Sequence, residues 1–350
     1  SVLSGKNHTI AEYEAAKSEE VVLAPQGTTP WKAAQFVWQV RSQLGAILCG
    51  EANADACEKV DTGGFRIVTT LDWTMQQTVE KWLLAAARAP QSSNAKRTLD
   101  RLKIPEKDQA WILALRDRNI NNAAGAIIDY RTGEVLAYVG SKDYYDLSPE
   151  VQGDYDSAGI AYRQPGSTFK LFTYLTGMLK GTPQGPLTAA SILNDIEFTM
   201  PDGSGKGYSP KNAPQGDGRS QQHGPITLRQ ALRQSLNLPA LSVARMVGVD
   251  AIMETVRQMG INRDWGDRSR YGLSFSLGAG EMRLIDMASA FQVVANGGRR
   301  VEPTMILKIM DRDGKVVKDY SQVETKQVIP EGVAYVMTDM LKDTTDPVNG

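Results

Sequence analysis

The sequence predicts a mixed α/β fold of the α+β type, which combines antiparallel hairpins with helices. Residues 124–129 and 134–139 are two β-rich runs separated by a short turn, which is typical of an antiparallel hairpin. Residues 306–310 and 315–320 repeat this pattern around the turn 311–314. Several longer segments show an apolar period of three to four residues, which predicts helices with one buried face. With 350 residues, 41% of them hydrophobic, the chain can bury a large core.

Residues 1–62 are predicted to form a helical connector. The stretch 9–12 has the form of a capping box, and Pro30 stands where a second helix begins. The predicted apolar face of the second helix consists of Phe36, Val37, Val40, Leu44 and Ile47. The only two cysteines, Cys49 and Cys57, lie close together after it. They either form a small disulfide loop, as in an oxidising compartment, or remain free thiols.

A strand and another helix are predicted next. Residues 63–70 are rich in β-forming side chains, Asp72 is placed to cap a helix, and a proline ends that helix. Its predicted inward side chains are Met75, Val79, Leu83 and Ala86. The polar residues 91–101 then predict a loop, in which Ser93 and Lys96 fit the pattern S-x-x-K. Clusters of Ser, Asn and Lys are usually solvated, so we interpret this copy as ordinary surface.

The segment 163–170 holds the strongest candidate for catalysis. Pro165 and Gly166 break the preceding chain, and the apolar period that follows predicts a helix beginning near Ser167. Because residues three apart share one face of a helix, we expect the Lys170 ammonium beside the Ser167 hydroxyl. A serine needs a base to become a nucleophile, and a lysine can be that base only if its pKa is lowered. Burial and the positive helix terminus would lower it, and the terminal N–H groups would bind an oxyanion.

A second polar pair, Ser235 and Asn237, is expected near this serine. Residues 227–230 fit a capping box for a short helix, and Pro239 begins the next helix. Held at this junction, the two short side chains can point into a cleft, although an ordinary capping turn explains the same residues. The glycine- and proline-rich stretch 181–225 is too long for a simple connection, so it either borders a site or is a surface excursion.

Three more helices are predicted in the last third of the chain. They span residues 250–260, 284–295 and 330–341. The second is ended by residues 296–297, and the last carries Val333, Val336, Met337 and Met340 at helical spacing. The methionines of the last helix are interpreted as core filler.

Composition excludes several classes of function. A net charge of −1 without a basic run argues against binding to nucleic acid or to anionic lipid. No apolar run approaches the roughly 20 residues of a membrane span, and no secretory signal opens the sequence. The two histidines, His8 and His223, are expected at the surface, and the absence of a G-x-S-x-G elbow argues against a Ser-His-Asp hydrolase. The cysteine spacing does not suit zinc, and residues 203–207 fall short of a phosphate loop, so we expect no metal and no cofactor.

Together these motifs resemble the transpeptidase domain of a class A, bifunctional penicillin-binding protein, a family in which S-x-x-K is a signature. The resemblance covers nearly the whole chain. Five segments match the family in chain order. Residues 64–72 match its first strand with the TTLD helix start, and residues 125–140 match its first hairpin. Residues 163–170 match its nucleophile segment, residues 232–240 its S-x-N segment and residues 290–298 its A-x-x-x-x-A-N-G-G helix end. The resemblance implies a penicillin-binding protein/β-lactamase-like transpeptidase fold for residues 63–350, in which an antiparallel sheet is flanked by helices. Residues 1–62 would connect it to a glycosyltransferase domain upstream.

The resemblance implies a D-Ala-D-Ala transpeptidase that cross-links peptidoglycan through a serine acyl-enzyme and is acylated by β-lactams. Ser167 would attack the penultimate D-Ala carbonyl while Lys170 takes its proton. Ser235 would relay a proton to the leaving D-Ala, and Asn237 would hydrogen-bond the amide of the donor peptide. The implied partners are stem peptides on lipid-linked or nascent glycan strands, β-lactam antibiotics and cell-wall synthesis proteins.

The resemblance also implies a place outside the cytoplasm, on the outer face of the bacterial cell membrane or in the periplasm. Because Ser1 is not an initiator Met, we expect a membrane anchor upstream. The family's third motif, K-[ST]-G, is not found, since residues 131–133 precede the nucleophile and residues 342–345 do not fit. We therefore expect a domain truncated before the strand that carries this motif, which would deprive the site of a carboxylate-binding group and an oxyanion donor.

Other functions fit the same fold. In a serine β-lactamase or a D,D-carboxypeptidase, water would attack the acyl-enzyme. The connector predicted for residues 1–62, which resembles that of class A penicillin-binding proteins, argues against both. A β-lactam sensor would be acylated without turnover. A non-catalytic cell-wall scaffold would not be acylated.

Overall fold

The computed structural model describes residues 14, 17–18, 30–199, 209–214, 219–266 and 271–345. The predicted capping box at 9–12, His8 and the turn at 203–207 lie outside these residues. The chain divides into two units, Ser1–Lys32 and Ala33–Gly350. The second unit holds the fold and the candidate site.

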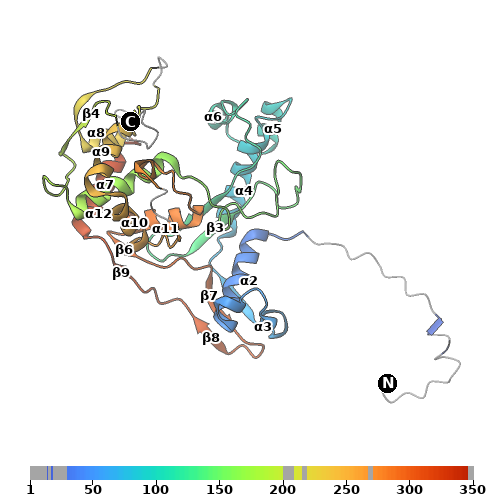
Figure 1. Cartoon of the computed structure of the whole chain (residues 1–350). Helices are drawn as coiled ribbons and strands as arrows, with labels where there is room; N and C mark the ends of the chain where they lie inside the picture. Colours follow the sequence, from blue (N-terminus) through green and yellow to red (C-terminus); the bar gives the residue numbers. More distant parts are fainter. Residues whose placement is uncertain are drawn as a thin grey trace. The chain divides into compact units, whose positions relative to one another are not determined.

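The second unit combines helices with short antiparallel strands (Figure 1). The helices are α2 (Ala34–Cys49), α3 (Glu58–Thr62), α4 (Trp73–Arg88), α5 (Ala95–Arg101), α6 (Gln109–Leu113), α7 (Lys170–Lys180), α8 (Leu228–Arg233), α9 (Asn237–Val247), α10 (Val249–Gln258), α11 (Leu284–Ala295) and α12 (Glu331–Lys342). Short 3-10 helices are η1 (Glu51–Asn53), η2 (Glu106–Asp108), η3 (Gly166–Phe169) and η5 (Leu273–Leu277). None of the described helices is both long and apolar enough to cross a membrane.

The described strands form small antiparallel sheets, so the predicted mixed α/β class is confirmed. The strands are β1 (Arg66–Thr69), β2 (Gly125–Ile128), β3 (Val135–Val139), β4 (Ile192–Asp195), β5 (Gly224–Thr227), β6 (Arg299–Arg300), β7 (Ile306–Met310), β8 (Val316–Asp319) and β9 (Lys326–Gln327). They pair in the orders β1-β7-β8, β2-β3, β4-β5 and β6-β9. Both predicted hairpins form, and the turn glycines Gly133 and Gly314 have φ of 76° and 82°, a region that favours glycine.

The largest apolar core surrounds α7. Nine of the eleven α7 residues are buried, and the helix packs against α8, α9, α10 and α12. The buried side chains contributed by the last two helices include Ile252, Met253, Met337 and Met340. The methionines of α12 are therefore core filler, as predicted.

A second core joins α2 to strands that follow it in sequence. Phe36, Val40 and Leu44 are buried as predicted, and they pack in one cluster with Val135 and Ile309. Residues on both sides of position 62 thus share one core, and the predicted domain division there stays a prediction.

Polar contacts and a disulfide complete this region. Gln35, Gln39 and Gln43 lie one turn apart on α2. Their side chains bond to Ser141 and Gly153, to Asp156, and to the Met305 N–H, respectively. Cys49 and Cys57 form a disulfide, which decides between the two alternatives that the sequence left open.

One predicted helix face is wrong in part. Asp72 caps α4 by accepting from the Met75 N–H, as predicted, but the Met75 side chain is 40% exposed. Gln76 is buried instead, and its amide bonds to both the N–H and the carbonyl of Tyr138 in β3, at 2.7 and 3.0 Å. A buried amide satisfied by a strand's backbone does not follow from apolar spacing, because that pattern assigns polar side chains to the solvent.

The predicted loop at residues 91–101 is also wrong in part, because its second half is helix α5. Asn94 caps this helix by accepting from the Arg97 N–H at 3.0 Å. Leu99 is fully buried in a small cluster with Ala85 and Ile112. A single apolar residue held by a distant helix explains why local periodicity missed α5.

Candidate active site

Ser167 lies in the first turn of the predicted helix. The turn begins as the 3-10 helix η3 and continues as α7, and it leaves the Ser167 side chain exposed. Phe169 anchors the turn from below, fully buried, with ring centroids 5.3 Å from Phe172 and 5.0 Å from Phe275. Just upstream, Arg163 exchanges two backbone hydrogen bonds with Met282, at 2.9 and 2.8 Å.

The end of η5 and the glycine after it support the same turn at close range. Gly278 has a φ of 84°, and a Cβ added there would lie 2.2 Å from the Gly166 carbonyl oxygen. Thr173 of α7 donates its hydroxyl to the Ser276 carbonyl at 3.0 Å. Only glycine therefore fits at position 278 without moving the turn that carries Ser167.

Lys170 is buried, with only 1% of the residue exposed. Its ammonium donates to the carbonyl oxygen of Ser235, to Ser235 Oγ at 3.2 Å and to Asn237 Oδ1 at 2.7 Å. These three acceptors match the three hydrogens of an ammonium group. Burial lowers the pKa of Lys170 from its ordinary 10.5 to about 8.

The structure thus brings Lys170, Ser235 and Asn237 together. Ser167 precedes Lys170 by one helical turn, as predicted, but no hydrogen bond joins the two side chains, since the Lys170 ammonium is turned toward Ser235 and Asn237. Catalytic hydrogen bonds are often absent or long in ligand-free sites and form only with substrate.

Ser235 lies at the predicted junction between helices. Thr227 and Gln230 form the capping box of α8, and Asn237 begins α9. Ser235 has a φ of 52°, unusual for a residue with a side chain, and its N–H bonds to the Leu232 carbonyl at 3.0 Å. This conformation turns the chain sharply enough to point both the carbonyl and the hydroxyl of Ser235 at Lys170.

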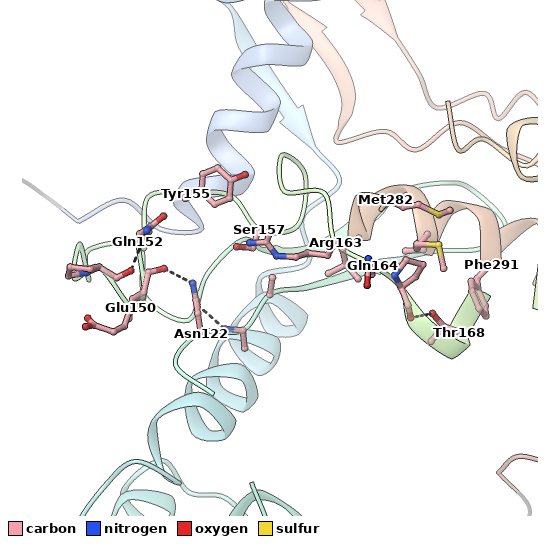
Figure 2. Close-up of a pocket in the computed structure, with 18 residues that line it drawn as sticks. Asn122, Glu150, Gln152, Tyr155, Ser157, Arg163, Gln164, Thr168, Met282 and Phe291 are labelled. Carbon is pink, nitrogen blue, oxygen red and sulfur yellow. Dashed lines mark hydrogen bonds between the residues drawn. The ribbon is translucent and has the colours of Figure 1, made fainter. Parts of the chain in front are cut away.

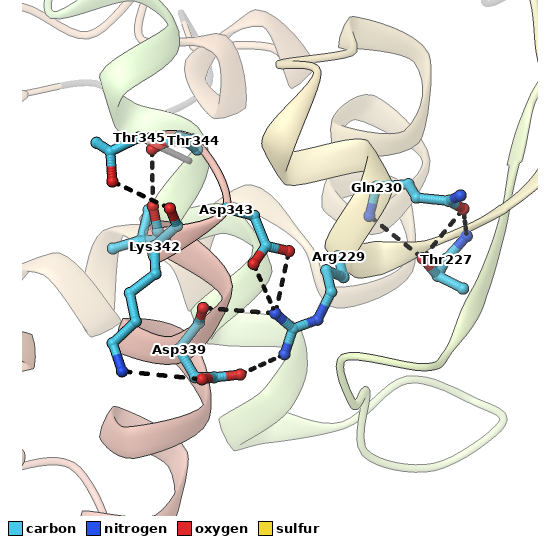
Figure 3. Close-up of polar contacts among 9 residues, drawn as sticks. Thr227, Arg229, Gln230, Asp339, Lys342, Asp343, Thr344 and Thr345 are labelled. Atoms are coloured by element: carbon cyan, nitrogen blue, oxygen red, sulfur yellow. Dashed lines mark hydrogen bonds and ion pairs between the residues drawn. The ribbon is translucent and has the colours of Figure 1, made fainter. Parts of the chain in front are cut away.

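An ion-pair cluster fixes helix α8 against α12 (Figure 3). Arg229 bonds to Asp339 at 2.5 Å and to Asp343 at 3.0 Å, and these hydrogen bonds raise the pKa of the guanidinium. Lys342 lies 4.0 Å from the same Asp339. The stretch 342–345 therefore consists of the last residue of α12 and the turn that follows it, rather than a K-[ST]-G strand.

Sequence reasoning missed the residues that hold Asn237. Its side-chain amide donates to the Lys211 carbonyl at 2.9 Å, and its backbone N–H donates to Asn212 Oδ1 at 2.8 Å. Asn212 in turn binds the buried carboxylate of Asp195 at 2.7 Å. All three lie in the stretch 181–225, where only its excessive length pointed toward a site.

A pocket of about 780 Å³ borders the nucleophile segment on another side (Figure 2). Arg163, Gln164 and Thr168 line it together with Met282 and Phe291. None of the four predicted site residues lines this pocket. The candidate catalytic side chains Lys170, Ser235 and Asn237 therefore lie outside this pocket.

The sequence matches a known protein family over most of its length. The family model "Penicillin binding protein transpeptidase domain" matches residues 123–350. The chain belongs to this family.

In the part of the chain that the structure describes, no group of three or more His, Cys, Asp or Glu residues could hold a metal ion.

Relatives of this penicillin-binding transpeptidase chain include penicillin-binding protein 1A of Neisseria meningitidis. The two are 34% identical over 271 residues, which is 74% of this chain and 31% of the relative. The chain thus spans about a third of the length of this curated relative. A crystal structure of penicillin-binding protein 1A from Haemophilus influenzae matches 96% of this chain and 61% of its own, with a TM-score of 0.66 at 21% identity. PonA1 of Mycobacterium tuberculosis in complex with penicillin V matches 87% of this chain and 69% of its own, with a TM-score of 0.60 at 23% identity. These two likenesses show the fold.

Proposed function

We propose that this protein is a D-Ala-D-Ala transpeptidase that cross-links peptidoglycan stem peptides through an acyl-enzyme on Ser167. The observation that carries the proposal is the buried Lys170, whose pKa is lowered to about 8 and which contacts Ser235 and Asn237 one turn after an exposed serine. Membership of the penicillin-binding transpeptidase family supports the same reaction.

In the acylation step, Ser167 Oγ attacks the carbonyl carbon of the penultimate D-Ala. The neutral form of Lys170 takes the hydroxyl proton as the Oγ–C bond forms. A backbone N–H group at the start of η3 stabilises the negative oxygen of the tetrahedral intermediate, as one of the donors that this oxygen needs. The C–N bond to the terminal D-Ala then breaks.

The leaving amine of D-Ala needs a proton as this bond breaks. Ser235 Oγ donates it and is reprotonated by the Lys170 ammonium, which lies 3.2 Å away. Asn237 binds the amide of the donor peptide. Deacylation reverses the path: the amine of a second stem peptide attacks the ester carbonyl, its proton passes back through the same groups, and Ser167 is released.

We place this activity outside the cytoplasm, on the outer face of the bacterial membrane or in the periplasm. The Cys49–Cys57 disulfide supports an oxidising compartment, because such bonds seldom persist in a reducing cytosol. Stem peptides on lipid-linked or nascent glycan strands are the proposed substrates. A β-lactam would acylate Ser167 in their place, by the same attack on a strained amide carbonyl.

The test is to incubate the protein with a fluorescent penicillin and to map the labelled peptide. We expect the label on Ser167, with none on Ser93 or on the variant Ser167→Ala. A D-Ala-D-Ala peptide offered with an acceptor amine should then yield the cross-linked product and free D-Ala.

The outcomes separate the competing functions. Label at Ser167 that is rapidly released as hydrolysed penicillin would indicate a β-lactamase, and stable label without any peptide reaction would indicate a sensor. Hydrolysis of the peptide in preference to transfer would indicate a carboxypeptidase. The absence of label on Ser167 would indicate a non-catalytic cell-wall scaffold.

A further inference from the structure

We propose that Asp195 and Asn212 are positioning residues, which act through Asn237 on the ammonium group of Lys170. The proposal rests on the proposed function of Ser167 and Lys170. It begins from a chain of buried and partly buried hydrogen bonds that leads from the end of β4, through the first residue of α9, to Lys170.

The Asn212 side chain uses its whole hydrogen-bonding capacity. It is 4% exposed, and its amide nitrogen donates to Asp195 Oδ1 at 2.7 Å and to the Gln221 carbonyl at 2.8 Å. Its oxygen accepts from the backbone N–H groups of Asn237 at 2.8 Å and Leu238 at 3.2 Å. A primary amide has two donor hydrogens and two acceptor sites, so only one orientation of Asn212 satisfies all four contacts.

Asp195 selects that orientation. Its carboxylate is fully buried, and its second oxygen accepts from the His223 backbone N–H at 2.9 Å and lies 2.6 Å from His223 Nδ1. The His223 ring is at the surface, as predicted, but it covers this carboxylate. Both carboxylate oxygens act as acceptors, so Asp195 holds the amide nitrogen of Asn212 toward itself and the amide oxygen toward Asn237.

The charge of Asp195 also acts on a side chain of the helix that carries Lys170. Burial, and then the negative charge of Asp195, raise the pKa of Tyr174, which follows Lys170 by one turn of α7. The carboxylate is therefore close enough to α7 for its charge to be felt there.

Asn212 caps α9 from a distance. The first N–H groups of a helix lack partners within the helix, and the preceding residue, Leu236, has no side-chain acceptor for them. Asn212 supplies it, although it lies 25 residues before Asn237 in sequence. Its neighbour Lys211 binds the Asn237 side-chain nitrogen with its carbonyl, which leaves Asn237 Oδ1 directed at Lys170. Two consecutive residues thus determine both the position and the orientation of Asn237.

The first experiment measures acylation of Ser167 by a fluorescent penicillin at saturating and at limiting concentration. We expect Asn212→Ala and Asp195→Asn each to lower the maximal acylation rate about 10-fold, the effect of a lost buried hydrogen bond to a charged or preorganised group. Asp195→Asn is nearly isosteric, but the NH2 group of the new side chain cannot accept a hydrogen bond. It must then face a donor, either the Asn212 amide nitrogen or the His223 backbone N–H. Asn194→Ala is the matched control, since Asn194 is the exposed neighbour of Asp195 in β4, and it should change the rate less than about twofold.

A double-variant cycle distinguishes positioning from general stabilisation. If Asn212 acts through Asn237, then Asn212→Ala should add less than about twofold when Asn237→Ala is already present. Effects that multiply in the double variant would overturn the proposal. Thermal unfolding of each variant, followed in parallel, identifies any variant that fails to fold, and Asp195→Asn then replaces Asn212→Ala in the cycle.

Amide hydrogen exchange gives a readout that does not depend on acylation. In Asn212→Ala and Asp195→Asn, the Asn237 and Leu238 amides should exchange about fivefold faster or more, while the Ala244 amide in the middle of α9 stays protected. Unchanged exchange at Asn237 and Leu238 would overturn the positioning role whatever happens at Ser167. An unaltered protein that is not acylated at Ser167 would refute the proposed function alone, because exchange still decides whether Asn212 holds Asn237.

Discussion

The pattern S-x-x-K occurs twice in this chain, and the two copies differ in the surroundings of their lysines. At Ser93, both the serine and the lysine are exposed, and the Lys96 side chain is 69% exposed with a 3.9 Å ion pair to Glu106. At Ser167, the serine is also exposed, but Lys170 is buried and bonded to residues some 65 positions away. The motif supplies a hydroxyl and an amine three residues apart, whereas the reactivity of the amine depends on burial.

The surroundings of the two helices account for this difference. Helix α5 has seven residues and rests on a small cluster around Leu99, so its polar face stays in water. Helix α7 crosses the largest core of the molecule and is buried on nearly every side. A lysine at its first residue therefore loses hydration, which penalises its charged form.

The largest expected effect comes from changing the lysines themselves. Lys170→Arg should lower the acylation rate at Ser167 by about 100- to 10,000-fold, because arginine stays protonated and cannot act as the base. Lys96→Arg is the matched control and should leave the rate unchanged. Stopped-flow acylation with a fluorescent penicillin measures both. Near-normal acylation in Lys170→Arg would remove Lys170 from the role of base.

A smaller effect is expected from the glycine that supports the Ser167 turn. Gly278→Ala and Gly314→Ala both place a side chain at a φ that favours glycine, 84° and 82°, but only the first brings a Cβ against Gly166. The shared backbone strain should lower stability by about 1–2 kcal/mol in each. The clash at Gly278 should add about 1–3 kcal/mol and slow acylation about 5- to 100-fold. Equal losses of stability and equal acylation rates in the two variants would show that the Gly166 contact does not matter.

The pH dependence of acylation should reveal the lowered pKa of Lys170. Only the neutral amine accepts the serine proton, so the rate should rise with pH through about 8 and level off above it. With this pKa the neutral fraction increases about tenfold between pH 7 and pH 9. The pH–rate profile at limiting penicillin concentration measures it. A midpoint near the ordinary lysine value of 10.5 would contradict the effect of burial on Lys170.

The smallest effect on acylation should come from the disulfide. Reducing Cys49–Cys57 opens a short loop at the end of α2 and should lower the free energy of unfolding by about 2–3 kcal/mol. The folded protein should still acylate Ser167 within about twofold of the oxidised rate, because the α2 core and the α7 core are separate clusters. Denaturant unfolding and acylation, each measured with and without reductant, test the two parts. A large loss of acylation below the unfolding transition would show that the two cores are coupled.

The sequence by itself determined the features that depend on neighbours along the chain. These features are the capping box of α8, the two hairpin turns, the apolar faces of α2 and α12 and the helix that follows Ser167. All of them depend on residues within a few positions of one another. Hydrogen bonds and backbone preferences at that range act wherever the segment is placed, so a short pattern predicts them. The same logic identified Ser235 and Asn237 as a pair held at a helix junction.

Only the tertiary structure decided which lysine is buried and which groups face it. Lys170 meets Ser235 and Asn237 across 65 and 67 residues, and Asn237 is held by Asn212, which is in turn held by Asp195. Gln76 and Leu99 are buried for the same kind of reason, because strand β3 and helix α4 happen to cover them. Burial is a property of the packed chain as a whole, and local spacing carries no information about which distant segment removes a side chain from water.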